Sequence, residues 1–133
     1  MIHGSCYCGS IKYEIHGKII MFANCHCRSC RKFTGSTFSS VLVVNADDFN
    51  VTREDNLCSY QSSPGKHRYF CNTCGCHVFS RVDYRPDMVF VKAGSLDDDP
   101  HAKPQFHFWT SNKAPWHEIL DNIPQYPEGL PEK

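Results

Sequence analysis

Three cysteines stand close together in the segment C-H-C-R-S-C-R-K at residues 25–32. The C-x-C-x2-C spacing lets Cys25, Cys27 and Cys30 converge on one metal ion from a single loop. Three thiolates around a Zn²⁺ ion leave a net charge of roughly −1. The cations beside them that would offset this charge are Arg28, Arg31 and Lys32. Structural zinc normally has four protein ligands, whereas a catalytic zinc has three and leaves one position for water or substrate, so the question is whether the fourth position here is open.

A second set of thiols has the spacing of a closed site. Cys6 and Cys8 form a C-x-C pair, and Cys71 and Cys74 form a C-x2-C pair between two expected strands. Together they predict a four-thiolate structural site that joins the N-terminal turn to the central hairpin and stabilises the fold. We expect Zn²⁺ in both sites, two ions per chain. Iron is the alternative in the four-thiolate site, but zinc, which has no redox chemistry, is more typical of a site made of a C-x-C pair and a C-x2-C pair.

Two cysteines and one histidine stay outside this assignment. Cys76 could complete either site, and Cys58 could do so if its strand passes close by. A lone buried cysteine is more often a small apolar core residue than a ligand, which is the simpler interpretation of Cys58. His26 lies between two ligands, so its ring is predicted to point away from the ion that they bind.

The composition narrows the class of protein. The chain has 133 residues, which favours a single domain over 1–133, and its 14 basic and 14 acidic residues cancel. No nucleic-acid partner is therefore expected. The start has no secretory signal and no segment is apolar for long enough to span a membrane, so the expected location is the cytoplasm.

Nine cysteines would suit a disulfide framework, but their odd count and tight clustering favour metal binding. The oligomeric state is not fixed by the sequence.

The expected elements are mostly strands. Alternating or β-branched segments predict them at residues 11–15, 19–23, 38–44, 49–51, 57–60, 67–70, 78–81, 88–92 and 106–109. One helical turn is expected at residues 31–33, and a frayed terminus at 130–133. Short strands at this spacing are typical of a sandwich or barrel-like β fold. The late aromatic residues are expected mainly in the core, with a protein-binding face as the alternative. They are Phe106, Phe108, Trp109 and Trp116.

Several short motifs together resemble one family. They are G-S-C-Y-C-G at 4–9, C-H-C-R-S-C-R-K at 25–32, S-S-P-G at 62–65, R-Y-F-C-N-T-C-G at 68–75, G-S-L-D-D at 94–98 and K-A-P-W at 113–116. In this order they are similar to the glutathione-dependent formaldehyde-activating enzyme (CENP-V/GFA) family, over roughly residues 3–127. The resemblance implies an Mss4-like fold of packed antiparallel sheets. It also implies a structural zinc on the thiols at positions 6, 8, 71 and 74, and a catalytic zinc on those at positions 25, 27 and 30.

The activity implied by the resemblance is that of a carbon–sulfur lyase, the reversible joining of glutathione and formaldehyde into S-hydroxymethylglutathione. A glutathione-like thiol would need cations for its carboxylates. The candidates are Arg28, Arg31, Lys32 and Arg68, although each could instead only offset thiolate charge or lie in solvent. Two other classes stay open. One is a non-catalytic zinc module that binds a protein partner, and the other is a thiol redox or methionine sulfoxide reductase-like protein that uses Cys58 or Cys76.

Overall fold

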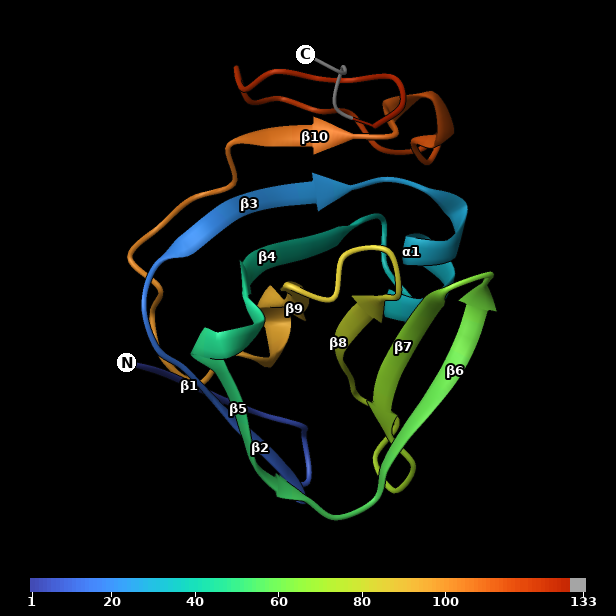
Figure 1. The fold of residues 1–133 in the computed structure, drawn as a ribbon. Helices are drawn as coiled ribbons and strands as arrows, with labels where there is room; N and C mark the ends of the chain where they lie inside the picture. Colours follow the sequence, from blue (N-terminus) through green and yellow to red (C-terminus); the bar gives the residue numbers. More distant parts are fainter. Residues whose placement is uncertain (130–133) are drawn as a thin grey trace.

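The computed structural model describes residues 1–129, and the expected frayed terminus at 130–133 lies outside the described residues. The described chain forms ten strands in two sheets (Figure 1). The smaller sheet has the order β1-β2-β5. Its strands are β1 (Ile2–Ser5), β2 (Ile11–Ile15) and β5 (Phe49–Glu54).

The larger sheet has seven strands in the order β10-β3-β4-β9-β8-β7-β6. Its strands are β3 (Ile19–Cys25), β4 (Ser39–Asn45), β6 (Leu57–Ser63), β7 (Lys66–Cys71), β8 (His77–Val82), β9 (Met88–Lys92) and β10 (Phe106–Phe108). Neighbouring strands are antiparallel except for β10, which pairs with β3 in parallel. The sheet is therefore mixed, and its β10 edge carries the C-terminal segment at the top of Figure 1.

The pleat of the large sheet separates a core face from a second face. Leu42 and Val44 of β4, and Val89 and Val91 of β9, lie in the core. They pack there with residues of the small sheet such as Tyr13. Because successive strand residues point to opposite faces, the intervening residues of β4 and β9 lie on the second face. That second face carries the cavity described below.

One short helix, α1 (Arg28–Thr34), follows β3 at the right of Figure 1. Cys27 caps its start, because its sulfur accepts a hydrogen bond from the Cys30 backbone N–H at 3.3 Å. Gly35 ends it in the left-handed conformation, with φ of 65°, and donates its N–H to the Arg31 carbonyl. The helix start thus presents two of the cysteines from a capped turn.

The prediction of a mostly β fold with packed sheets is confirmed, and each expected strand is present within a few residues. Other expectations were wrong. β1 was not anticipated, and the helix begins at Arg28 rather than at residue 31. Trp109 and Trp116 are 39% and 72% exposed, so neither tryptophan belongs to the core. Among residues 1–129, no helix has the length and hydropathy needed to cross a membrane.

Candidate metal centres

The four-cysteine cluster joins the N-terminal turn to the hairpin that follows β7, as the cysteine spacing predicted. Cys6 and Cys8 lie in the turn between β1 and β2, while Cys71 ends β7 and Cys74 follows in the next turn. Their four sulfurs lie within 4.8 Å of one another. The Cys6–Cys8 and Cys8–Cys71 sulfur pairs are both 3.7 Å apart.

The donor set and its surroundings fit a tetrahedral zinc ion. Zinc–sulfur bonds of about 2.3 Å in a tetrahedron place the sulfurs about 3.8 Å apart. The Ile11 backbone N–H lies 3.3 Å from the Cys6 sulfur and the Cys74 N–H lies 3.5 Å from the Cys71 sulfur. Such hydrogen bonds to sulfur favour the thiolate. Burial is the largest influence on Cys71 and would raise its pKa, but hydrogen bonds from the Ser10 hydroxyl and from the backbone N–H groups of Cys74 and Thr73 lower this pKa to about 6.

The three-cysteine cluster lies where β3 runs into α1. Cys25 is the last residue of β3, Cys27 is the helix cap, and Cys30 lies in the first turn of α1. Their sulfurs also lie within 4.8 Å of one another, and no fourth ligating residue of the described chain joins them. Cys30 is buried, whereas Cys25 and Cys27 are half-buried. The set therefore fits a metal ion with three protein ligands.

The charges near this cluster come from strands distant in the sequence. Hydrogen bonds from Cys25 and Cys27 lower the pKa of the Cys30 thiol, and the positive charges of Lys92 and Lys66 lower it further. Conversely, hydrogen bonding with Cys27 and Cys30 raises the pKa of Cys25. One thiol of the cluster is thus the preferred thiolate even without an ion.

Lys92 is an unusual residue for this position. Its side chain is 7% exposed, and its ammonium donates a hydrogen bond to the Ser39 hydroxyl at 3.0 Å. Burial lowers its pKa from 10.5 to about 8, although the Cys30 thiolate acts in the opposite direction. A buried cation needs a compensating negative charge, and the cysteine cluster supplies it.

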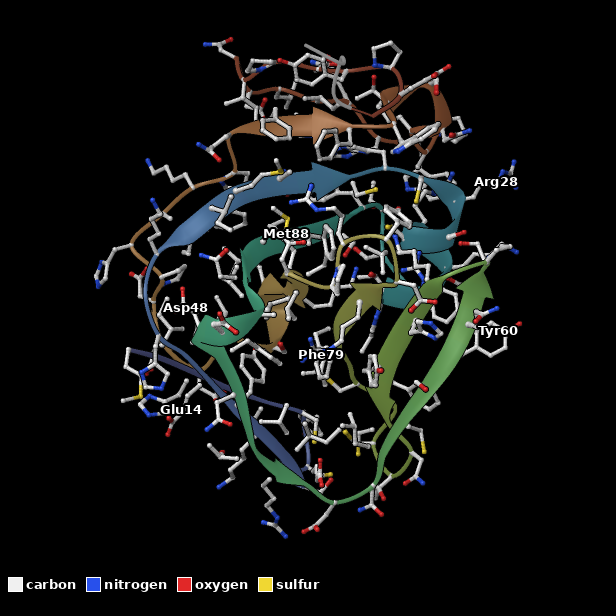
Figure 2. All side chains as sticks on the ribbon, viewed as in Figure 1. Glu14, Arg28, Asp48, Tyr60, Phe79 and Met88 are labelled. Carbon is white, nitrogen blue, oxygen red and sulfur yellow. The ribbon has the colours of Figure 1, made fainter. Side chains whose placement is uncertain are left out.

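A cavity of about 360 Å³ opens beside the cluster on the second face of the large sheet. Cys25, Cys30 and Lys92 are among its lining residues. Most other lining side chains are apolar, and Met88, labelled in Figure 2, is one of them. The three-cysteine cluster is therefore accessible to a small molecule from this side.

The cations expected to bind substrate lie in two different places. Arg28, Arg31 and Lys32 line a separate surface cavity of about 380 Å³ together with Trp116, and no cysteine lines it. The Arg31 guanidinium lies 5.3 Å from the Trp116 ring centroid and donates a hydrogen bond to the Asn112 carbonyl. Figure 2 shows Arg28 at the outer side of the molecule, near α1.

Arg68, by contrast, is 1% exposed. It packs over the Phe33 ring at 4.6 Å and donates a hydrogen bond to the Ser62 hydroxyl at 2.9 Å. Arg68 does not line either of these two cavities. The structure thus brings three of the four predicted cations together, and it buries the fourth elsewhere.

Cys58 and Cys76 join neither cluster. Both are half-buried, so Cys58 is not the fully buried core residue that the sequence favoured. Burial is the largest influence on Cys76 and raises its pKa. A reactive thiol normally has a lowered pKa and good access, so Cys76 is a poor candidate for redox chemistry.

Two buried histidines and an exposed aspartate form a chain of side chains that supports the loop carrying the three cysteines. His26 lies between Cys25 and Cys27 and is fully buried, with its Nε2 2.8 Å from His107 Nδ1. His107 Nε2 lies 2.9 Å from an Asp121 carboxylate oxygen. Since a carboxylate only accepts, His107 donates from Nε2 and accepts at Nδ1 from His26. The His26 ring is thus held by His107, in a network that the sequence spacing did not reveal.

The fold and the two clusters define a class: a mostly β protein that presents two thiolate sites suited to metal, one with four ligands and one with three. The family model described as "Glutathione-dependent formaldehyde-activating enzyme" matches residues 1–112. The chain belongs to this family.

Similar proteins agree with this assignment. A Halomonas elongata protein named after glutathione-dependent formaldehyde-activating enzyme is 29% identical over 90% of this chain and 81% of its own. A Podospora anserina protein named in the same way is 32% identical over 80% of this chain, which spans about half of that relative (53%). A crystal structure of a Rhodobacter sphaeroides protein shares the fold, with a TM-score of 0.63 and 22% identity over 92% of this chain and 98% of that one.

Proposed function

We propose that residues 1–133 act as one zinc-dependent enzyme of the carbon–sulfur lyase type, which reversibly joins a small thiol to a small aldehyde. The family's named chemistry suggests glutathione and formaldehyde as the reactants. The observation that carries the proposal is the contrast between the clusters, because one has four sulfurs and the other has three beside a cavity. The first would be structural, and the second would hold the catalytic ion.

The joining reaction needs no oxidant. The sulfur of the thiol forms a bond to the carbonyl carbon, the π bond of the carbonyl breaks, and the oxygen takes the proton that the thiol released. A zinc ion held by Cys25, Cys27 and Cys30 would supply a Lewis acid that lowers the pKa of a thiol. The reverse reaction breaks the same carbon–sulfur bond, as a lyase does.

The chain's own residues would assist in two ways. The cavity holds both reactants next to the cysteines, which removes much of the entropic barrier of a bimolecular reaction. Lys92 adds a positive charge to the cavity that Cys25 and Cys30 also line, and this charge would stabilise the negative charge that the aldehyde oxygen gains. Seven of the nine cysteines lie in the two clusters, where their grouping suits metal binding rather than disulfides, and this supports a reducing compartment such as the cytoplasm.

Zinc stoichiometry combined with X-ray absorption at the zinc edge tests this proposal. We expect two zinc ions per chain, one with four sulfur ligands and one with three sulfurs and a lighter atom. An added small thiol, glutathione or 6-mercaptohexanoate, should convert the second site to four sulfurs. Cys27→Ser should remove one ion and abolish thiol-dependent formaldehyde uptake, whereas Cys58→Ser should retain both ions and the activity. Two sites that are all-sulfur without added thiol would refute the proposal.

A second candidate is a non-catalytic zinc module that binds a protein. The exposed side chains of Trp116 (72%) and Leu120 (81%) favour it, because exposed large apolar residues, tryptophan above all, often mark contact surfaces. Two saturated zinc sites together with loss of partner binding in Trp116→Ala would support this candidate over the enzyme.

A further inference from the structure

The cavity beside the three-cysteine cluster is built from one face of the large sheet. Met21 and Ala23 of β3, Val41 and Val43 of β4, and Phe90 of β9 line it. Their neighbours in sequence, such as Val91, point to the opposite face and lie in the core. The pleat thus gives the cavity long walls of methyl and aromatic groups.

The charges of the cavity have one sign. The charged residues that line it are Lys66, Lys92 and Arg85, and no Asp or Glu of the described chain does so. Arg85 is already paired with Asp87 at 3.0 Å. Within residues 1–129 Lys66 makes neither an ion pair nor a side-chain hydrogen bond, so its ammonium is available to an anion.

Trp109 completes the wall through a strained backbone. Its φ is 55°, the left-handed region that a bulky residue rarely adopts. A hydrogen bond of 2.9 Å from its N–H to the Glu128 carbonyl holds this conformation, and its side chain lines the cavity. Such strain is concentrated at functional sites, where the surrounding structure maintains it.

These walls suit glutathione poorly. Glutathione carries an ammonium group, two amides and two carboxylates, and its ammonium and amide N–H groups would require acceptors. Among residues 1–129, the side chains that line the cavity offer the Ser80 hydroxyl as an acceptor but no carboxylate. A buried polar group without a partner is costly, and that cost would fall on the parts of glutathione farthest from its sulfur.

We propose that this site takes the adduct of a thiol with an apolar, alkyl-like body and a single anionic group, which pairs with Lys66. This inference rests on the proposed function, because it identifies the substrate class of the same site. The apolar body would lie along β3, β4 and β9, and the sulfur would face Cys25 and Cys30. The cavity of Arg28, Arg31 and Lys32 would then have no part in binding the thiol.

Binding of simple probes tests the inference without any turnover. The zinc-loaded full chain would carry Trp116→Phe, so that Trp109 is the remaining tryptophan and reports on the cavity by fluorescence. The probes are butanoate, hexanoate, hexylamine and S-methylglutathione. We expect saturable binding of hexanoate, with about three- to fourfold tighter binding for each added methylene from butanoate to hexanoate. We expect binding at least about tenfold weaker for hexylamine, which cannot pair with an ammonium.

Matched variants distinguish the two cavities. Lys66→Met should remove the preference for hexanoate over hexylamine, whereas Lys12→Met, an exposed lysine on the small sheet, should leave it unchanged. Tighter binding of S-methylglutathione than of hexanoate would overturn the inference. The inference would also be overturned if Arg31→Met, and not Lys66→Met, removed hexanoate binding. A dimer in sedimentation that hexanoate dissociates would overturn it as well, because a second copy of the chain would then cover the cavity.

Turnover separates this inference from the proposed function. Faster formaldehyde uptake with 6-mercaptohexanoate than with glutathione would support both. Faster uptake with glutathione would overturn the inference and leave the proposed function standing. No uptake with either thiol would overturn the proposed function, and with it the assignment of a substrate, even if hexanoate binds.

Discussion

Lys92→Met is the substitution that best tests the pairing of a buried cation with the three-cysteine cluster. Lys92 is 7% exposed, and burial lowers its pKa from 10.5 to about 8. At 1.36 kcal/mol for each unit of pKa, holding this charge in the fold at pH 7 costs about 3 kcal/mol. Methionine has a similar shape and no charge, but it also loses the hydrogen bond to Ser39, worth about 1 kcal/mol.

Whether Lys92→Met stabilises or harms the protein therefore depends on whether the three thiols are present. In a background where Cys25, Cys27 and Cys30 are all serine, Lys92→Met should raise the free energy of unfolding by at least about 2 kcal/mol, because the pKa of about 8 already includes the favourable charge of Cys30 that this background lacks. In the zinc-loaded wild-type background the lysine balances the net negative site. There Lys92→Met should weaken zinc binding at the second site by about 10- to 100-fold. Substituting residues that contact the metal ligands, without binding the metal themselves, has an effect of this size in other metal sites.

The pH dependence of the free energy of unfolding gives a second test of the charge on Lys92. The folded-state pKa of Lys92 is lower than the unfolded value, so the unfolded chain binds more protons between about pH 8 and 10.5. The charge penalty is complete below pH 8 and disappears as the pH rises to 10.5. The advantage of Lys92→Met in the triple-serine background should therefore be largest at pH 7 and shrink towards pH 10.

Urea unfolding followed by circular dichroism measures the stability terms, and competition with a chelator measures zinc affinity. Lys103→Met, at an exposed position, is the control and should change stability by less than about 0.5 kcal/mol. The reasoning fails if Lys92→Met destabilises the triple-serine protein at pH 7. It fails equally if zinc affinity at the second site does not change.

Three further predictions concern the first metal site and the core. Cys8→Ser should remove one of two zinc ions and lower the melting temperature, whereas Cys58→Ser should keep both ions, as metal analysis and calorimetry would show. Gly4→Ala should destabilise the fold by about 1–3 kcal/mol in urea unfolding, since a Cβ there would lie 2.0 Å from the Tyr13 ring; an unchanged midpoint would contradict this. Tyr13→Phe should cost about 1 kcal/mol, because it removes the buried 2.6 Å hydrogen bond to the Ser95 hydroxyl, and a wild-type midpoint would show that this bond is not needed.

The features that could be predicted from the sequence are those that a local pattern of residues determines. Strand alternation and cysteine spacing are local signals, so the strands and the grouping of seven thiols into two clusters could be predicted. β1 was missed because Ile2–Ser5 is four residues long and contains a glycine, which is disfavoured in strands.

Contacts between distant segments could not be predicted in the same way. The charges that act on Cys30 come from Lys66 and Lys92, whereas sequence proximity had suggested Arg28, Arg31 and Lys32. Sheet order alone brings these distant strands together, and it depends on the packing of the whole chain. The parallel pairing of β10 with β3, and the link from His26 to His107, depend on the same long-range packing.

The two clusters differ in how much chain must exist before each can form. The three-cysteine cluster uses six consecutive positions, whereas Cys8 and Cys71 of the four-cysteine cluster are 63 residues apart. Closing the longer loop costs about 2 kcal/mol more in chain entropy. At roughly 5–20 residues per second, synthesis would take several seconds to go from Cys30 to Cys74. We expect a nascent chain to capture its first metal ion at Cys25–Cys30, so the site that we propose to be catalytic would be loaded before the four-cysteine site.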